Sequence, residues 1–190
     1  MNIALFGGRF DPPHVGHAAI AQYILSADLG IDQVWLLPAH THPWRPIVAS
    51  DADRLAMVRF LENKNILVKD IELVRGETTR TIDTIRQLKR ELPEHTYFWI
   101  CGVDQVADLA KWDNNDELQE SLTFLIIPRK GFNQHIDLPK KYIFISEKYS
   151  ITDLSSSEIR DKIHKGLSIK GLVPEKVEKY IGEKGLYVSN

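Results

Sequence analysis

The amino-acid sequence predicts an α/β fold in which a doubly wound parallel sheet carries helices on both faces and is followed by a C-terminal helical segment. Two observations lead to this fold class. Short apolar runs, bounded by glycine, proline or polar clusters, alternate along the chain with segments that have helical spacing. These runs are nearly continuous, which is typical of parallel strands buried on both faces. The chain has 190 residues and shows neither a repeat nor a linker, so we expect a single domain over residues 1–190.

The first elements are a strand, a glycine-rich loop and a helix. The apolar residues 3–6 predict the strand, and Ile20 and Ile24 lie on one face of a helix that begins at or near His14. The loop, residues 7–13, contains two glycines that permit a tight turn and two prolines that stiffen the crossing.

The remaining elements are defined by apolar spacing, capping signals and proline stops. The expected strands are residues 33–38, 66–73, 97–101, 122–127 and 142–145. The expected helices are residues 50–61, residues 81–92, a short helix around 106–109 that ends near Trp112, a helix that opens at 153–160, and residues 175–183 with Pro174 at the first helical position. Ligands of such sheets bind at the carboxyl ends of the strands.

The composition is that of an ordinary globular protein, with 43% hydrophobic and 26% charged residues. The formal net charge is −2 and there is no basic tail, so nothing supports binding of long nucleic acid. Cys101 is the only cysteine, which excludes an intrachain disulfide and predicts a buried thiol. Neither a leader pattern nor an apolar run of about 18 residues is present. We therefore expect a cytoplasmic protein that does not bind membranes.

The glycine-rich loop and the helix after it have the features of an anion site. The free N–H groups and the positive dipole end of the helix face the loop, and Gly7 and Gly8 allow close approach of the backbone to a ligand. His14 and His17 are three residues apart, which places both imidazoles on the same side of one helical turn. Gly16 between them leaves room for a phosphate. A common turn and a solvated histidine explain each residue alone, but the combined pattern favours a phosphate undergoing reaction.

A second phosphate site is predicted at residues 155–160. Serines at a helix start are explained by capping alone. The functional interpretation adds the hydroxyl groups of Ser156 and Ser157 as partners for phosphate oxygens, with Arg160 one turn further on as a forked cation. The two sites match the ends of a triphosphate, with the two histidines at the α-phosphate and the serine–arginine helix at the β- and γ-phosphates.

At two further positions, the sequence is compatible with both a structural and a functional explanation. A turn explains Gly102 and a helix cap explains Asp104, yet a carboxylate there also suits ribose hydroxyls. Trp112 is explained as a core residue, and it equally offers a flat face to a heteroaromatic ring.

The motifs of this chain, taken in order, resemble one family over nearly the whole sequence. They are GGRFDPPHVGH (7–17), TRTIDTI (79–85), ICGVD (100–104), LAKW (109–112), IIPRKG (126–131), LSSSEIR (154–160) and LVPEKVEKYI (172–181). Together they resemble the bacterial nicotinate-nucleotide adenylyltransferases, a branch of the Rossmann-like HxGH nucleotidyltransferases. Arg9 stands where that family usually has Thr or Ser, and Arg45 stands in for a lysine in a loop that only partly matches.

The resemblance implies adenylyl transfer from ATP, with Mg²⁺, to the phosphate of nicotinic acid mononucleotide, which gives deamido-NAD and pyrophosphate. His14, His17 and Arg160 would be catalytic, and no metal site made by the protein itself is expected. The residues expected at ATP are Gly7, Gly8, Phe10, His14, His17, Gly102, Asp104, Arg129, Ser156, Ser157 and Arg160. Those expected at the mononucleotide are Arg45, Thr81, Thr84 and Trp112.

Several other functions are alternatives to this interpretation. Pantetheine-phosphate adenylyltransferases share the serine–arginine helix, but they are typically shorter and lack the TRTIDTI and LAKW segments. Another HxGH nucleotidyltransferase, such as a cytidylyltransferase, is a further alternative within the superfamily. A zinc-dependent hydrolase would use His14, His17, His40 and His42 as ligands, but it would leave the glycines and the serine–arginine helix unexplained. A nucleotide-binding sensor would bind ATP without releasing pyrophosphate.

Overall fold

Strand β1 (Asn2–Gly8) lies at the centre of a parallel sheet. The computed structural model describes residues 1–41, 46–78, 80–128, 137–145 and 154–188, and within them six strands form one sheet in the order β3-β2-β1-β4-β5-β6. All five strand pairs are parallel. The other strands are β2 (Gln33–Pro38), β3 (Ile66–Val68), β4 (Thr96–Gly102), β5 (Thr123–Ile127) and β6 (Tyr142–Phe144). The strand order reverses between β1 and β4, as expected for a doubly wound sheet.

Two apolar cores cover the two faces of the sheet, because successive side chains of a strand point to opposite faces. Ala4 of β1 belongs to the first core, and Ile3 and Leu5 belong to the second. The first core includes residues of α1 (Val15–Ser26), α2 (Asp51–Arg59), α7 (Ser156–His164) and α8 (Glu175–Lys184). The second includes residues of α4 (Thr81–Glu91), α5 (Val103–Val106), the 3₁₀ helix Leu109–Lys111 and α6 (Asn115–Ser121). The predicted doubly wound α/β architecture is confirmed.

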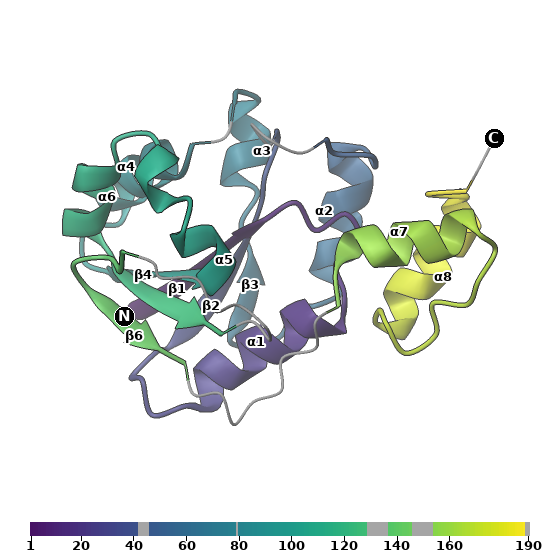
Figure 1. The fold of residues 1–190 in the computed structure, drawn as a ribbon, viewed down its shortest axis with the longest axis horizontal. Coiled ribbons are helices and arrows are strands. Elements are labelled where there is room, and N and C mark those ends of the chain that lie inside the picture. The colour runs from purple at the N-terminus through teal and green to yellow at the C-terminus, as the bar shows by residue number, and fades with distance from the viewer. Residues whose placement is uncertain (42–45, 79, 129–136, 146–153, 189–190) are drawn as a thin grey trace.

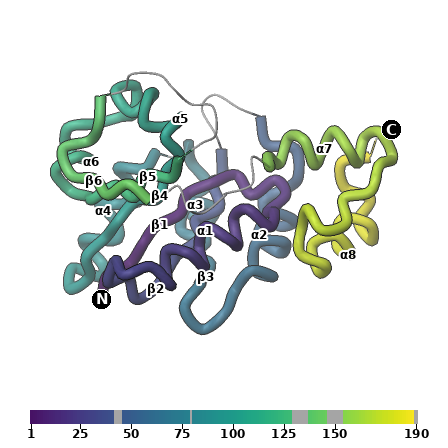
Figure 2. Tube along the Cα trace, turned by 60° about the horizontal axis from the view of Figure 1, so that its bottom comes forward, coloured from purple at the N-terminus to yellow at the C-terminus, as the bar shows by residue number. Residues whose placement is uncertain are grey.

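Helices α7 and α8 form the C-terminal helical segment and lie together at one end of the molecule, beyond α2 (Figure 1). Figure 2 shows the same arrangement after a turn of 60°. The Tyr180 hydroxyl of α8 donates a hydrogen bond of 2.9 Å to Asp53 of α2. In the part of the chain that is described, no helix is long and apolar enough to cross a membrane.

Capping signals located the helix starts well. Ser50 caps α2 by accepting a hydrogen bond from the Asp53 N–H, and Ser155 forms a complete capping box with Glu158 at α7. The sequence predicts Pro174 as the first helical residue, and this is wrong. Pro174 is the N-cap that precedes α8, with an extended backbone.

The expected strand over residues 66–73 is wrong in its second half. β3 ends at Val68, and the chain continues as α3 (Ile71–Arg75). Among the described residues, β3 is an edge strand that pairs only with residues 34–36 of β2. Further along, β2 ends in Pro38, which has no N–H to donate to a neighbouring strand. The helix α6 was not predicted from the sequence, because its seven residues contribute a single buried side chain, Leu118.

The turn after β1 is not made by the two glycines. Gly7 and Gly8 are the last residues of β1 and pair with Leu37 and Pro38, and the residue with a left-handed backbone is Phe10, with φ of 48°. The predicted role of these glycines in a tight turn is therefore wrong.

Candidate active site

A cavity of about 670 Å³ opens at the carboxyl ends of the central strands. The last residues of β1 and β4 line it, so the cavity lies where the strand order reverses, which is the usual ligand site of such sheets. Its volume falls in the range of small-molecule sites. The sequence-predicted residues that line it are Gly7, Gly8, Phe10, His14, His17, Thr81, Gly102, Asp104, Trp112 and Ser156.

His17 is oriented by the backbone of the helix cap. His14 is the N-cap of α1, and its backbone N–H donates to His17 Nδ1 over 3.1 Å. Because Nδ1 accepts this hydrogen bond, the proton of the neutral imidazole lies on Nε2, which is the donor atom of the ring. The ring also packs against His14, with centroids 3.7 Å apart, and against Phe10, at 4.9 Å. The geometry therefore presents two adjacent imidazoles at a helix N-terminus.

The close packing of two tryptophans explains why residue 7 is a glycine. A Cβ atom at Gly7 would lie 2.6 Å from Cη2 of Trp99, closer than real contacts allow. Trp99 of β4 in turn packs edge-on against Trp112, with centroids 6.2 Å apart. Gly7 thus makes room for an aromatic wall of the cavity, and Trp112 presents part of that wall.

Helix α7 is attached to the loop that precedes α1. Ser156 Oγ donates to the Pro12 carbonyl over 2.8 Å, and Arg160 Nη1 donates to the Asp11 carbonyl over 2.6 Å. Arg160 Nη2 also donates to Ser157 Oγ over 3.2 Å. Ser157 and Arg160 are not among the residues that line the cavity, but these bonds hold α7 against the loop that leads directly into the two histidines.

The remaining predicted residues are Thr84, Arg45 and Arg129, together with two histidines of the zinc alternative. Thr84 is 0% exposed, does not line the cavity, and donates its hydroxyl to Glu72 Oε1 over 2.9 Å. Arg45 and Arg129 lie outside the described residues. His40, one of the four histidines of the zinc alternative, forms a short hydrogen bond with Asp51, and His42 also lies outside the described residues. Among the described residues, no group of three or more His, Cys, Asp or Glu is placed to hold a metal ion.

Asp11 does not line the cavity but holds the loop beside it, a role that the sequence motif did not reveal. Its side chain is 0% exposed. The two carboxylate oxygens accept hydrogen bonds from the N–H of Val48 at 2.7 Å, the N–H of Ala49 at 3.1 Å and the hydroxyl of Tyr187 at 2.7 Å. Burial and the Asp11 carboxylate raise the pKa of Tyr187, so this hydroxyl remains a donor.

Glu72 is the second residue that was missed. It lines the cavity, yet its side chain is 2% exposed. Burial raises the pKa of Glu72 to about 7, against weaker opposing effects of the Thr84 hydrogen bond and the charge of Arg75. No local signal marks it, because residue 72 was expected in a strand and its partner is 12 residues away.

The only cysteine behaves as expected. Cys101 is buried in β4, and burial, with a smaller effect of Asp104, raises the pKa of its thiol to about 12. Such a thiol stays protonated and unreactive at neutral pH.

Comparison with known proteins identifies the family. Residues 5–162 match the family model described as cytidylyltransferase-like. Two similar bacterial proteins carry the name "Probable nicotinate-nucleotide adenylyltransferase": that of Exiguobacterium sibiricum is 38% identical over 100% of both chains, and that of Halalkalibacterium halodurans is 40% identical over 99% of this chain and 92% of its own.

A solved structure agrees with these relatives. The nicotinic acid mononucleotide adenylyltransferase of Plasmodium falciparum, complexed with NaAD, superposes with a TM-score of 0.83 at 26% identity, covering 98% of this chain and 97% of that one. This chain therefore belongs to the cytidylyltransferase-like family and, within it, to the nicotinate-nucleotide adenylyltransferases.

Proposed function

We propose that the protein transfers the adenylyl group of ATP to the phosphate of nicotinic acid mononucleotide, releasing pyrophosphate and forming deamido-NAD. The supporting observation is that one cavity is lined both by the paired imidazoles His14 and His17 and by Thr81 and Trp112. The first pair suits a reacting phosphate, and the second suits a pyridine nucleotide. The full-length relatives carry the name of this activity, which favours it over pantetheine-phosphate adenylyl transfer.

The acceptor phosphate supplies the nucleophile. Its oxygen attacks the α-phosphorus of ATP, and the bond from that phosphorus to the bridging oxygen of the β-phosphate breaks. A phosphate is already nucleophilic at neutral pH, so catalysis consists of positioning and charge stabilisation. His17 donates from Nε2, and His14 acts beside it, to the α-phosphate oxygens as negative charge develops there.

The leaving group is stabilised from α7. Two hydrogen bonds, to the Asp11 carbonyl and to Ser157, orient the Arg160 guanidinium and leave its other N–H groups for phosphate oxygens. The Ser156 hydroxyl already donates to the Pro12 carbonyl, so the Ser157 hydroxyl and the backbone N–H groups of the helix N-terminus are the further donors to phosphate oxygens.

Nucleotidyltransferases of this kind generally use a divalent metal with ATP. We propose that Mg²⁺ enters as Mg-ATP, held by the phosphate oxygens. The histidine, serine and arginine donors of this end of the cavity suit phosphate better than a metal ion. Mg²⁺ would supply charge neutralisation on the departing pyrophosphate.

The acceptor end of the cavity lies at the start of α4. Thr81 begins this helix, so its free N–H groups and dipole favour an anion there. Asp83, the carboxylate that would oppose an acidic ligand, is 38% exposed and pairs with Arg86 at 3.7 Å, and it does not line the cavity. We therefore propose a preference for the acid over the amide mononucleotide of at least about tenfold, or about 1.4 kcal/mol.

We further propose that residues 1–190 act as one nucleotidyltransferase domain in the cytoplasm. The Tyr187 hydroxyl, near the end of the chain, bonds to Asp11 in the first loop, which supports a single unit.

A pyrophosphate-release assay with ATP and a panel of acceptors tests the activity. We expect release with nicotinic acid mononucleotide, together with deamido-NAD as the second product, and little release with phosphopantetheine or without acceptor. ATP binding without release would favour a sensor. Release that requires phosphopantetheine would replace the proposed acceptor.

A further inference from the structure

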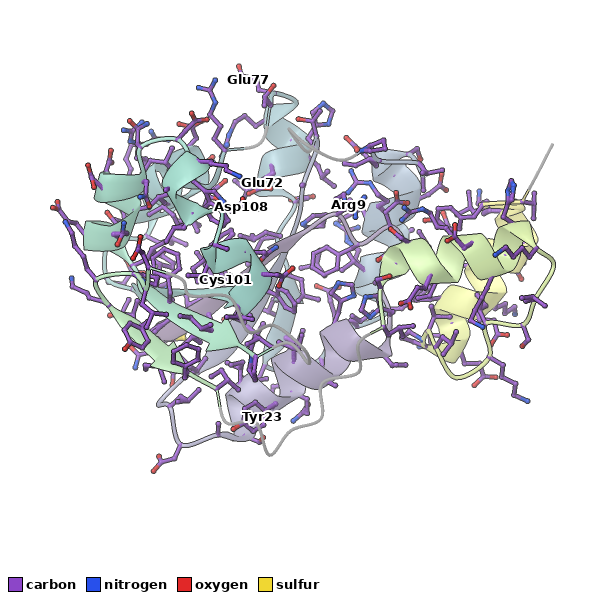
Figure 3. The ribbon with its side chains drawn as sticks, in the orientation of Figure 1. Arg9, Tyr23, Glu72, Glu77, Cys101 and Asp108 are labelled. Atoms are coloured by element: carbon purple, nitrogen blue, oxygen red, sulfur yellow. The ribbon has the colours of Figure 1, made fainter. Side chains whose placement is uncertain are left out.

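Glu72 is a buried glutamate in the lining of the cavity, beside the proposed acceptor site. It lines the same cavity as Arg80, Thr81 and Trp112. Figure 3 shows Glu72 further from the outline of the molecule than Glu77, and Asp108, also labelled there, lines the same cavity. A glutamate that is 2% exposed and lines a ligand cavity carries its charge in a poorly solvated place close to whatever fills that cavity.

We infer that Glu72 determines the choice between acid and amide acceptors: its protonated carboxyl admits the ring carboxylate of nicotinic acid mononucleotide, and its ionised form disfavours that carboxylate. This inference rests on the proposed function and concerns a residue to which that function gives no role. The protonated group offers an O–H donor, whereas the ionised group offers only acceptors and a like charge.

The surroundings of Glu72 offset this charge in part, through Arg75, which also donates hydrogen bonds to Thr84 over 3.3 Å and to Gln87 over 3.0 Å. On α3 the charged neighbour is Arg75, and from α4 the contact is the neutral Thr84 hydroxyl. β2, on which α3 packs, has only uncharged side chains in Gln33–Pro38.

The other cations near the acceptor end have acidic partners. Arg80 pairs with Asp113 at 3.1 Å, and Lys111 pairs with Asp108 at 2.6 Å. The charged and titratable residues that line the cavity with Glu72 are Arg9, Arg80, Lys111, Asp104, Asp108, Asp113, His14 and His17.

The pKa of Glu72, raised to about 7 by burial, makes the two forms exchange within the working range of pH. At about pH 6 most of this group is protonated, and at about pH 8 most is ionised. If only the protonated form admits the acid, the preference for acid over amide falls about tenfold between these two values of pH.

The experiment measures kcat/KM for nicotinic acid mononucleotide and for nicotinamide mononucleotide across this pH range and takes their ratio. Both reactions use the same ATP, the same acceptor phosphate and the same enzyme groups, so the effects of pH on these cancel in the ratio. We expect the ratio to fall about tenfold in the wild type and to stay constant in Glu72→Gln, which keeps an oxygen for the Thr84 hydroxyl. Glu77→Gln, an exposed glutamate five residues along the chain, is the matched control and should retain the fall.

A constant ratio in the wild type, or an undiminished fall in Glu72→Gln, would overturn the inference. Thr84→Val provides a second test if Glu72→Gln does not fold. It removes a hydrogen bond that lowers the pKa of Glu72, so the fall should move to higher pH; an unmoved fall counts against Glu72. If neither mononucleotide is adenylylated, the proposed function itself fails. If transfer occurs with a constant ratio, only the role of Glu72 is lost.

Discussion

The hydrogen bond between Tyr187 and Asp11 joins the two ends of the chain, and its removal tests how the loop before α1 is held. Tyr187→Phe deletes only the hydroxyl that donates to the buried Asp11 carboxylate over 2.7 Å. The N–H groups of Val48 and Ala49 remain, so the carboxylate keeps partners on both oxygens. A hydrogen bond to a charged group contributes about 1.5–3 kcal/mol. We expect the free energy of unfolding to fall by about that amount.

Asp11→Asn should cost more than Tyr187→Phe. Each carboxylate oxygen accepts one backbone N–H, but an amide has a single oxygen, so one of the two N–H groups faces an NH₂ group and loses its acceptor. The loss of this hydrogen bond costs about 1–3 kcal/mol, in addition to the cost of weakening the hydrogen bond from Tyr187. Because the two residues are in contact, the double mutant should be less destabilised than the sum of the two single mutants.

Urea unfolding at neutral pH measures these differences. Tyr142→Phe is the control, because Tyr142 is 43% exposed on β6, and we expect a change within about 0.5 kcal/mol. A Tyr187→Phe variant as stable as the wild type, or strictly additive effects in the double mutant, would refute the view that this bond secures the loop.

Four further predictions follow from the same structure. His17→Ala should lower turnover by about two to four orders of magnitude with little change in the circular dichroism spectrum; near-normal turnover would remove it from the mechanism. Arg160→Lys keeps the charge but loses the fork, so KM for ATP should rise while KM for the acceptor changes little; the reverse pattern would exchange the two ends of the cavity. The pKa of Glu72 is about 7 in the native state, against the ordinary 4.5. Its protonated form therefore contributes fully to the free energy of unfolding below about pH 4.5, and this contribution is lost as the pH rises to about 7. The stability of Glu72→Gln relative to wild type should therefore rise by up to about 3 kcal/mol between about pH 4 and pH 8 in urea titrations, and no such rise would contradict the raised pKa. Gly7→Ala should lower the free energy of unfolding by about 1–3 kcal/mol, measured by thermal unfolding, because the new methyl group overlaps the indole ring of Trp99. Gly182→Ala in α8, where a Cβ atom would have nothing within 4 Å, should raise it by about 0.5–1 kcal/mol. Equal effects of the two substitutions would contradict the packing argument.

Sequence patterns predicted elements well where the signal was local. Ser50 and Ser155 cap the helices they were expected to open, because a cap depends on residues three positions apart. The apolar run of residues 33–38 is β2 without change of bounds. The pattern failed over residues 66–73, where the end of the neighbouring strand, and not the local sequence, decides how far pairing continues.

The candidate site was predicted unevenly for the same reason. His14 and His17 were found because one helical turn joins them, and both line the cavity. Arg160 donates to the carbonyl of Asp11, which is 149 residues away in the sequence, and to the hydroxyl of Ser157, which is three residues away. Only the shorter of these was open to sequence reasoning.

By itself, the sequence determined the α/β class, the glycine-rich loop with its paired histidines and the serine–arginine helix, since each depends on periodicity or on spacing within one turn. Only the tertiary structure decided what Gly7, Asp11 and Glu72 do. Gly7 is required by an indole ring from β4, Asp11 is held by the end of the chain, and Glu72 is buried against α4. Burial and the exclusion of overlapping atoms arise between segments far apart in the chain, so no pattern within one segment contains them.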